Sequence, residues 1–371
     1  MDQPSHEPIH LVDLKAQHAE IADEVAQGFA KVIADTAFVL GPQVREFEEA
    51  FARFCGLPHC VGVANGTDAI EFTVRALGLG AGDEVIVPAN TFIATALGVV
   101  RAGARPVIVD CDEYQLLDPA RIEASIGPRT RAVLPVHLFG QIANMEAIAE
   151  VAEIRDLAVI EDGAQSQGAR RNGKPSGAFG VAAATSFYPG KNIGAYGDAG
   201  AVVTASEEVA AHLRKLRNWG SEKKYHHPEI GFNSRLDTLQ AVVLSAKLKR
   251  LEAWNQARRQ AAARYDQLLA GIDQIELPKT LPGNEHVWHL YVIRVQNRDE
   301  VLAKLNAEGI GAGIHYPVPL HLHGALQDLG YREGDFPEAE RAAQEILSLP
   351  MYPHITEAQQ QRVAEVLRRA L

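Results

Sequence analysis

The sequence predicts an α/β fold in which a large, mainly parallel β-sheet is followed by a smaller α/β domain. Three features support this. Short strand-like runs alternate with helical stretches over residues 61–218, one long helical stretch covers 236–270, and shorter strand and helix patterns continue beyond it. A chain of 371 residues is also long enough for more than one domain. We expect a large domain at residues 1–250 and a smaller domain at 251–371.

Two amphipathic helices are expected before the sheet, at residues 14–34 and 43–54. Apolar residues recur in both stretches near the spacing that places them on one helical face. In the first helix they are Leu14, Ile21, Val25, Phe29 and Val32, and in the second Val44, Phe47, Phe51 and Phe54. We assign both helices to the large domain.

The strands and helices then alternate. The expected strands are 61–64, 84–87, 106–110, 132–137, 158–161, 183–187 and 201–204. The expected helices are 68–78, 92–102, 145–155 and 206–218. Because helices that connect parallel strands lie against the faces of the sheet, we expect a sheet covered on both sides.

The C-terminal part is expected to begin with one long helix at 236–270 that joins the two domains. Pro278, Pro282 and Gly283 indicate a linker after it. The remaining patterns predict a strand–helix–strand–helix unit at 287–295, 299–308, 310–316 and 338–346.

Composition excludes several classes of function. The net charge is −11, which argues against a nucleic-acid-binding protein. No apolar stretch reaches the ~18 residues of a membrane span, and the first ten residues lack the basic and apolar regions of a signal peptide. Three scattered cysteines do not make a disulfide framework and indicate free thiols in a reducing compartment. We expect a cytoplasmic protein.

Polar residues and glycines directly follow several expected strands. Ligands of open parallel sheets bind beyond the carboxyl ends of the strands, so these segments are candidate binding loops. They are ANGTD at 64–68, ANTF at 89–92, EDGAQ at 161–165 and SFYPGKN at 186–192. In the first, Gly66 permits a close backbone approach, and the Thr67 hydroxyl with the free N–H groups of a helix start can bind an anion. A plain helix cap with a glycine turn explains the same residues.

Asp162 and Lys191 add charged groups to two of these loops. A carboxylate at a strand end can hold a protonated heterocyclic nitrogen, although Asp162 also suits a turn or a helix cap. A partly desolvated lysine is readily deprotonated and can form a Schiff base, although Lys191 also suits a solvated turn. Taken with the anion site, the Ser186 hydroxyl and the Phe92 ring, these groups match one cofactor, pyridoxal 5′-phosphate.

A metal site is the competing interpretation of a histidine-rich segment. His315, His321 and His323 occur in HYPVPLHLH, and an HxH pair with a third histidine is a plausible ligand set. The prolines between them indicate a rigid loop, and no acidic residue or cysteine follows before Asp328. We expect a loop that lines a cleft, and no metal.

Segments along nearly the whole chain resemble a known family. They include FVLGPQVREFEEAFARFCG, ANGTDAI, GDEVIVPANTFIATA, VIEDGAQSQGA, TSFYPGKNIGAYGDAG, GFNSRLDTLQA and GIHYPVPLHL. They resemble the DegT/DnrJ/EryC1/StrS group of pyridoxal-phosphate-dependent nucleotide-sugar aminotransferases. The resemblance implies fold type I, the aspartate aminotransferase-like fold. Gly163 and Ala199 depart from the family's usual Ala and Gly, and neither change removes a functional group.

The resemblance implies a role for each candidate residue. Lys191 bonds covalently to the cofactor aldehyde, Asp162 pairs with the pyridine nitrogen, and Gln165 lies near the cofactor's O3′. Phe92 stacks on the ring. The residues implied to hold the phosphate are Gly66, Thr67 and Ser186.

A homodimer with shared active sites is also implied, because Asn233 in GFNSRLD is similar to the family's Asn that reaches the phosphate of the neighbouring subunit. The positions similar to sugar-binding residues are Tyr188, Lys224, His315 and Tyr316, and the last three are expected from the partner chain.

The resemblance also implies a reaction. Some relatives carry His at the position of Lys191 and dehydrate sugars, so the lysine favours an aminotransferase. L-Glutamate would give its amino group to leave 2-oxoglutarate and pyridoxamine phosphate, and a dTDP- or UDP-linked ketosugar would receive it in deoxyamino-sugar biosynthesis. The sequence looks closest to enzymes for dTDP-3-keto-6-deoxyhexoses. A UDP-3-keto-hexuronate, a 4-keto sugar, or a non-catalytic binding or regulatory protein remain the alternatives.

Overall fold

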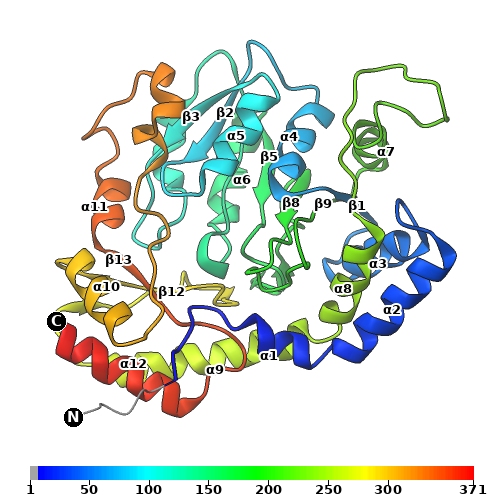
Figure 1. Cartoon of the computed structure of the whole chain (residues 1–371). Helices are drawn as coiled ribbons and strands as arrows, with labels where there is room; N and C mark the ends of the chain where they lie inside the picture. The colour runs from blue at the N-terminus through cyan, green and yellow to red at the C-terminus, as the bar shows by residue number, and fades with distance from the viewer. Residues whose placement is uncertain (1–6) are drawn as a thin grey trace.

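The computed structural model describes residues 7–371 and arranges them around one large sheet and two small ones (Figure 1). The large sheet has seven strands in the order β1-β9-β8-β5-β4-β2-β3. They are β1 (His59–Val63), β2 (Glu84–Pro88), β3 (Arg105–Val109), β4 (Thr130–Val133), β5 (Ala158–Asp162), β8 (Ala182–Ser186) and β9 (Gly200–Thr204). Only β9 runs antiparallel to its neighbours, so the predicted mainly parallel sheet is confirmed.

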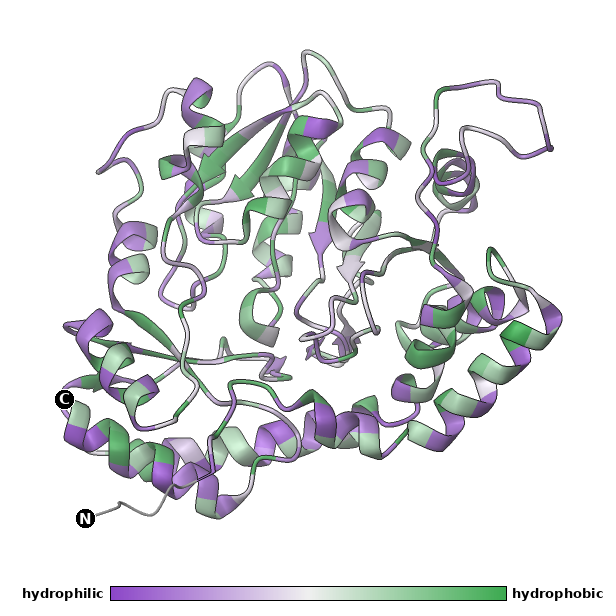
Figure 2. Ribbon diagram, in the orientation of Figure 1, coloured by the Kyte–Doolittle hydropathy of each residue, from purple (hydrophilic) through white to green (hydrophobic). Residues whose placement is uncertain are grey.

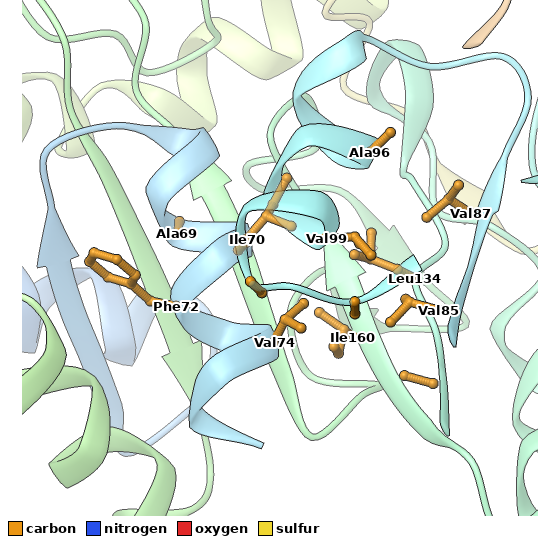
Figure 3. Close-up of a cluster of buried hydrophobic side chains, with 14 of the residues drawn as sticks. Ala69, Ile70, Phe72, Val74, Val85, Val87, Ala96, Val99, Leu134 and Ile160 are labelled. Atoms are coloured by element: carbon orange, nitrogen blue, oxygen red, sulfur yellow. The ribbon is translucent and has the colours of Figure 1, made fainter. Parts of the chain in front are cut away.

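Helices cover both faces of this sheet, as predicted. They are α4 (Gly66–Ala76), α5 (Ile93–Arg101), α6 (Met145–Arg155) and α7 (Glu207–Leu216). Side chains alternate between the faces of a strand: in β2, Val85 and Val87 belong to the core cluster with α4 and α5, while Ile86 belongs to the cluster with α6. Figure 3 shows the α4 and α5 side chains packed over β2 and β5.

The first amphipathic helix is broken, which corrects the single helix expected at 14–34. The structure has α1 (Leu14–Ala19) and α2 (Ala22–Asp35). Ile21 leaves the helical conformation, with φ −124° and ψ 2°, and its N–H bonds to the His18 carbonyl in a tight turn. The Glu20 carboxylate beside it accepts a hydrogen bond from Trp254 Nε1, so a tertiary contact fixes this turn. The second expected helix is α3 (Pro42–Phe54).

The long helix expected at 236–270 is also two helices, α8 (Thr238–Leu248) and α9 (Leu251–Leu269). They meet at Arg250, whose N–H bonds to the Lys247 carbonyl. Packing explains the break, because α8 lies against α2 and α3, whereas α9 packs along α12 (Glu357–Ala370). The division into domains at residue 250 stays a prediction that this change of packing partner supports.

The smaller C-terminal unit contains the antiparallel sheet β10-β12-β13, formed by β10 (Ile275–Glu276), β12 (Tyr291–Val295) and β13 (Ile346–Leu349). The helices α10 (Arg298–Ala307) and α12 pack on it around a separate core. The strand expected at 310–316 is wrong: Ile310 and Gly313 make only single bridges, to Ile9 and Ser348.

The remaining elements complete the surface. The expected helix at 338–346 is α11 (Pro337–Glu345), and a second small sheet joins β11 (Asn284–Glu285), β6 (Arg170–Arg171) and β7 (Lys174–Pro175). Figure 2 shows hydrophobic residues concentrated in the strands of the large sheet and mixed with hydrophilic ones along α9 and α12. Within residues 7–371, the helices are too short or too polar to cross a lipid bilayer.

The three cysteines are free and buried. The expected absence of a signal peptide concerns the first ten residues, of which 1–6 lie outside the described part of the chain.

Candidate active site

A cavity of about 530 Å³ lies at the carboxyl ends of the parallel strands. All four loops expected to bind a ligand contribute to its wall. Of the residues selected from the sequence, those lining it are Gly66, Thr67, Phe92, Asp162, Gln165, Ser186, Tyr188, Lys191, His315 and Tyr316. The topology therefore brings together groups that are up to 250 positions apart in the chain.

One end of the cavity is the start of α4. Asn65 caps this helix by accepting a hydrogen bond from the Asp68 N–H through its side chain. The first amides of a helix have no partner within it and favour negative charge. Gly66 also lies against Ser186, because a Cβ placed on Gly66 would come within 2.6 Å of the Ser186 Cβ. A glycine here lets the amides and the Ser186 hydroxyl approach one anion.

Asp162, the last residue of β5, is buried and hydrogen-bonded at both oxygens. Thr95 donates its hydroxyl to Oδ2 at 2.8 Å, and the Ala164 N–H donates to Oδ1 at 3.1 Å. Thr91 in turn supports Thr95, with 2.9 Å between their hydroxyl oxygens. Burial raises the pKa of Asp162, and the bond from Thr95 opposes that rise. The site thus holds a carboxylate whose ionised form a cation would stabilise.

Glu161 anchors the same strand from the other face of the sheet. Its carboxylate accepts hydrogen bonds from His137 Nε2 at 2.8 Å and from the backbone N–H groups of Gly177, Phe179 and Gly180. Burial alone would raise the pKa of Glu161, but the bonds from His137 and the backbone lower it. Glu161 is therefore a structural anion that fixes the end of β5.

Lys191 provides a half-buried lysine side chain in the loop between β8 and β9. Its backbone N–H bonds to the Tyr188 carbonyl in a tight turn. Burial lowers the pKa of Lys191 to about 8, although the charge of Asp162 acts in the opposite direction. A lysine in this state is a far better nucleophile and base at neutral pH than a solvated one.

Aromatic rings surround the open side of the cavity. Phe92 is 52% exposed, and its ring centroid lies 5.3 Å from that of Tyr316. The Tyr316 hydroxyl accepts a hydrogen bond from Gln165 Nε2 at 3.0 Å, and Gln165 Oε1 accepts the Phe139 N–H at 2.6 Å. Gln165 is thus held beside Asp162 with a fixed side-chain orientation.

Two of the expected contributions from a partner chain are corrected. His315 and Tyr316 line the cavity of their own chain, and His315 Nδ1 lies 2.8 Å from the Ser348 hydroxyl. The contact with Ser348 of β13, the edge strand of the small sheet, holds them there. Asn233 and Lys224 do not line this cavity. They lie in the segment between α7 and α8, part of which projects from the molecule in Figure 1, and Asn233 forms a bridge with Asn218.

The three histidines of the alternative metal site do not meet. His321 Nε2 lies 2.8 Å from Glu340 Oε1, away from the cavity that contains His315. In the part of the chain from residue 7 to 371, no three His, Cys, Asp or Glu side chains are arranged to hold a metal ion.

Several cavity residues are not predicted by the sequence patterns. Thr95 lies one helical turn after Thr91 on the first turn of α5, and that spacing could have identified it. Leu11, Val12 and His289 also line the cavity. They come from the N-terminal segment and from the segment before β12, and no local pattern marks them.

Comparison with known proteins decides the family. The model of the DegT/DnrJ/EryC1/StrS aminotransferase family matches residues 19–368. The chain belongs to this family. The resemblance found in the sequence is confirmed, and the protein is an aminotransferase.

Three curated relatives are each 46% identical. The dTDP-3-amino-3,4,6-trideoxy-alpha-D-glucose transaminase of Streptomyces venezuelae matches 97% of this chain and 95% of its own. The UDP-N-acetyl-3-dehydro-alpha-D-glucosamine 3-aminotransferase of Acidithiobacillus ferrooxidans matches 98% of each. A protein of Geobacillus stearothermophilus named pleiotropic regulatory protein matches 96% of this chain and 97% of its own.

A solved structure confirms fold type I. The crystal structure of S. venezuelae DesV, in complex with a ketimine intermediate, is 46% identical to this chain. It superposes with a TM-score of 0.96 over 98% of each chain.

Proposed function

We propose that this aminotransferase uses pyridoxal 5′-phosphate to move the amino group of L-glutamate to C3 of a nucleotide-linked 3-ketosugar. The products are 2-oxoglutarate and the 3-aminosugar. The single observation that carries the proposal is that the half-buried Lys191 and the buried Asp162 line one cavity whose far end is the start of α4.

The residues of the cavity fit this cofactor. Its phosphate suits the α4 amides at Gly66 and Thr67 with the Ser186 hydroxyl, where a Cβ on Gly66 would fill the space. A cationic ring nitrogen suits Asp162, because it would lower the raised pKa of that carboxyl group. When bound, pyridoxal phosphate supplies a ring that stabilises negative charge at the amino donor's α-carbon.

Lys191 supplies the acid–base chemistry. With a pKa of about 8, roughly a tenth of the Lys191 amines are uncharged at pH 7, several hundred times more than for a lysine of ordinary pKa. The free amine takes the α-proton of glutamate and returns it to a neighbouring carbon, which is general base and general acid catalysis by one positioned group. In the second half of the reaction, Lys191 moves a proton in the reverse sense on the sugar.

The sugar specificity is supported by the relatives and by the lining of the cavity. The two transaminases act, by their names, at C3 of dTDP- and UDP-linked sugars. Within residues 7–371, no arginine lines the cavity and Lys191 is its one lysine. Leu11, Val12 and Ile70 give it apolar walls instead. This lining favours a 6-deoxysugar, which has no carboxylate, over a hexuronate as the sugar part of the substrate.

A homodimer with shared sites completes the proposal. Asn233 and Lys224 lie outside the cavity of their own chain, in the segment between α7 and α8 whose Tyr225 and Ile230 are among the most exposed apolar residues. We assign this segment to the cavity of the partner subunit. Mixing Lys191→Ala with Asn233→Ala subunits tests the assignment, because the heterodimer has one intact site. Activity should return on mixing, and no recovery would argue that each chain works alone.

The overall function is tested with purified protein. It should be yellow, and L-glutamate should convert its visible absorption band to that of pyridoxamine phosphate. Running the reaction backwards with 3-amino and 4-amino sugars linked to dTDP or UDP, plus 2-oxoglutarate, should form glutamate fastest from a dTDP-linked 3-aminosugar. Faster turnover of a 4-aminosugar or a hexuronate would reject the substrate assigned above.

A regulatory protein without turnover is the second candidate, favoured by the name of the Geobacillus relative. The same experiment separates the two, because a cofactor band that glutamate leaves unchanged would favour the regulatory protein.

A further inference from the structure

A chain of buried amide side chains connects α9 to the two loops that carry Asp162 and Lys191. Asn255 of α9 donates Nδ2–H to the Gln167 carbonyl at 2.9 Å, in the loop after β5. Its Oδ1 accepts a hydrogen bond from Asn192 Nδ2, also at 2.9 Å, and Asn192 directly follows Lys191. Both asparagines are buried. One side chain of α9 therefore bridges the loops whose separation sets the geometry of the site.

The orientation of each amide is fixed by its partners. A backbone carbonyl can only accept, so the Asn255 amide must direct Nδ2 toward Gln167 and Oδ1 toward Asn192. Asn192 Nδ2 also donates to the Val287 carbonyl at 3.1 Å. Asn192 Oδ1 is consequently an acceptor, and its neighbour in the structure is His289 Nδ1 at 3.1 Å.

This arrangement determines the protonation of His289. Because Asn192 Oδ1 accepts, the proton of the neutral imidazole is on Nδ1, and Nε2 carries the lone pair. His289 lines the cavity with Lys191. Burial lowers the pKa of His289 well below its usual range, and the positive charges of Lys191 and Arg258 and the nearby His315 and His286 act in the same direction. The imidazole is therefore neutral.

The backbone leaves room for the bridging amide. Gly168 has φ +91°, and a Cβ placed there would come within 2.6 Å of Asn255 Nδ2. The side chain of Gln167 continues the network, since its Nε2 donates to the Thr185 hydroxyl at 2.8 Å and to the Ser186 carbonyl at 3.0 Å. The network thus links the end of β5, the end of β8 and α9.

We propose that Asn255 and Asn192 are positioning residues, which set Lys191 relative to Asp162 and hold His289 as a neutral imidazole whose Nε2 accepts hydrogen bonds in the cavity. The inference rests on the proposed function, because it concerns the proton transfers of Lys191. A neutral acceptor can orient an amine without adding the negative charge that would raise the pKa of that amine.

The test is Asn255→Asp in the holoenzyme, which keeps the shape of the side chain but removes the N–H that Gln167 requires. We expect kcat to fall ~100-fold with KM for glutamate nearly unchanged, because a displacement of about 1 Å is enough to slow a positioned reaction by this factor. The isotope effect with α-deuterated glutamate should increase, because proton transfer becomes slower than the other steps.

Gln360→Glu is the matched control. Gln360 is equally buried and donates Nε2–H to the Ala261 carbonyl of α9 at 2.7 Å, in the core of the smaller unit. This variant should lose stability yet keep the kcat and isotope effect of the parent enzyme. An equal loss of kcat in both variants, or parent values in Asn255→Asp, would overturn the proposal.

The protonation of His289 is tested without any substitution that could prevent folding. NMR of the unmodified protein with ¹⁵N-labelled histidine should show His289 as the Nδ1–H tautomer from about pH 6 to 9, since no titration is expected there. A proton on Nε2, or titration in this range, would contradict the proposal. If borohydride trapped no cofactor adduct, the proposed function would be rejected. The NMR measurement of the His289 tautomer would still be valid, because it does not depend on the cofactor.

Discussion

The two ends of the active-site cavity are built differently. At the inner end, Asp162 is buried and Lys191 half-buried, and Asp162 receives a hydrogen bond at each oxygen. At the open end, Tyr188 and Phe92 are 60% and 52% exposed. Asp162, Lys191 and the groups that hydrogen-bond to Asp162 come from one chain, which suits chemistry that is the same for every substrate. The open end lacks covering groups, which suits a region where a partner subunit and the sugar nucleotide determine specificity.

The comparison predicts the largest effect for Lys191→Ala. Activity should fall by at least ~1,000-fold, because the same amine bonds to the cofactor and moves the proton. Steady-state kinetics measure the loss, and borohydride followed by mass spectrometry should find no adduct. If this variant kept its turnover, the chemical step could not be assigned to Lys191 at the inner end.

Removal of Lys191 should also change the stability of the apoprotein with pH. Burial lowers the pKa of Lys191 from 10.5 to about 8, so the folded state disfavours its charged form. The cost is fully present below pH 8, amounts to about 3 kcal/mol in order of magnitude, and disappears as the pH rises to 10.5. Lys191→Met apoprotein should therefore unfold at higher denaturant concentration than the parent at pH 7, with the difference shrinking above pH 8. If the two proteins differed in stability by the same amount at pH 7 and at pH 10.5, the burial argument would be contradicted.

Asp162→Asn should have the next largest effect. The amide keeps the shape but cannot hold a positive charge, and loss of such electrostatic stabilisation costs ~100- to 1,000-fold in kcat. The measurement is the single-turnover rate with glutamate. A rate within a few-fold of the parent would show that the charge of Asp162 is not needed.

Thr95→Val should have a smaller effect that is still confined to the inner end. Thr95 lowers the pKa of Asp162 by donating to it, so its removal should raise that pKa further. We expect a ~10-fold fall in kcat, the scale of one hydrogen bond to a charged group, and a shift of the acidic limb of the pH–rate profile to higher pH. The matched control is Thr73→Val, since Thr73 donates only to the Ala69 carbonyl within α4.

The smallest effect is expected at the open end. Tyr188→Phe should raise KM for the sugar nucleotide by a few-fold, roughly the contribution of one exposed hydrogen bond, and leave the glutamate half-reaction unchanged. A slower glutamate half-reaction would mean that the two ends are not functionally separate.

The sequence predicted the inner end better than the open end, for a physical reason. Strand ends with their loops are local features, so Asp162, Ser186 and Lys191 could be placed at one sheet edge from periodicity alone. His315 and Tyr316 reach the cavity through a contact between distant segments, and their attribution to a partner chain was wrong. Leu11 and Val12 also reach the cavity from a distant segment of the chain, so local patterns did not mark them.

The errors in secondary structure also follow from tertiary packing. The helical pattern runs through residues 14–34 and 236–270. The contact between Glu20 and Trp254 fixes the turn at Ile21, and the turn at Arg250 occurs where α8 and α9 take different packing partners. Around residues 310–316, Ile310 and Gly313 pair only as single bridges, and β13 takes the place in the small sheet that this segment was expected to fill.

The central claim is most directly tested by mapping the cofactor to one lysine. Lys247 of α8 is a natural internal control, because burial lowers its pKa to about 8 as well, yet it lies outside the cavity that contains Asp162. After reduction with borohydride and digestion, the account predicts a pyridoxyl group on the peptide containing Lys191 and none on the peptide containing Lys247. A label on Lys247, or an unlabelled protein, would contradict it.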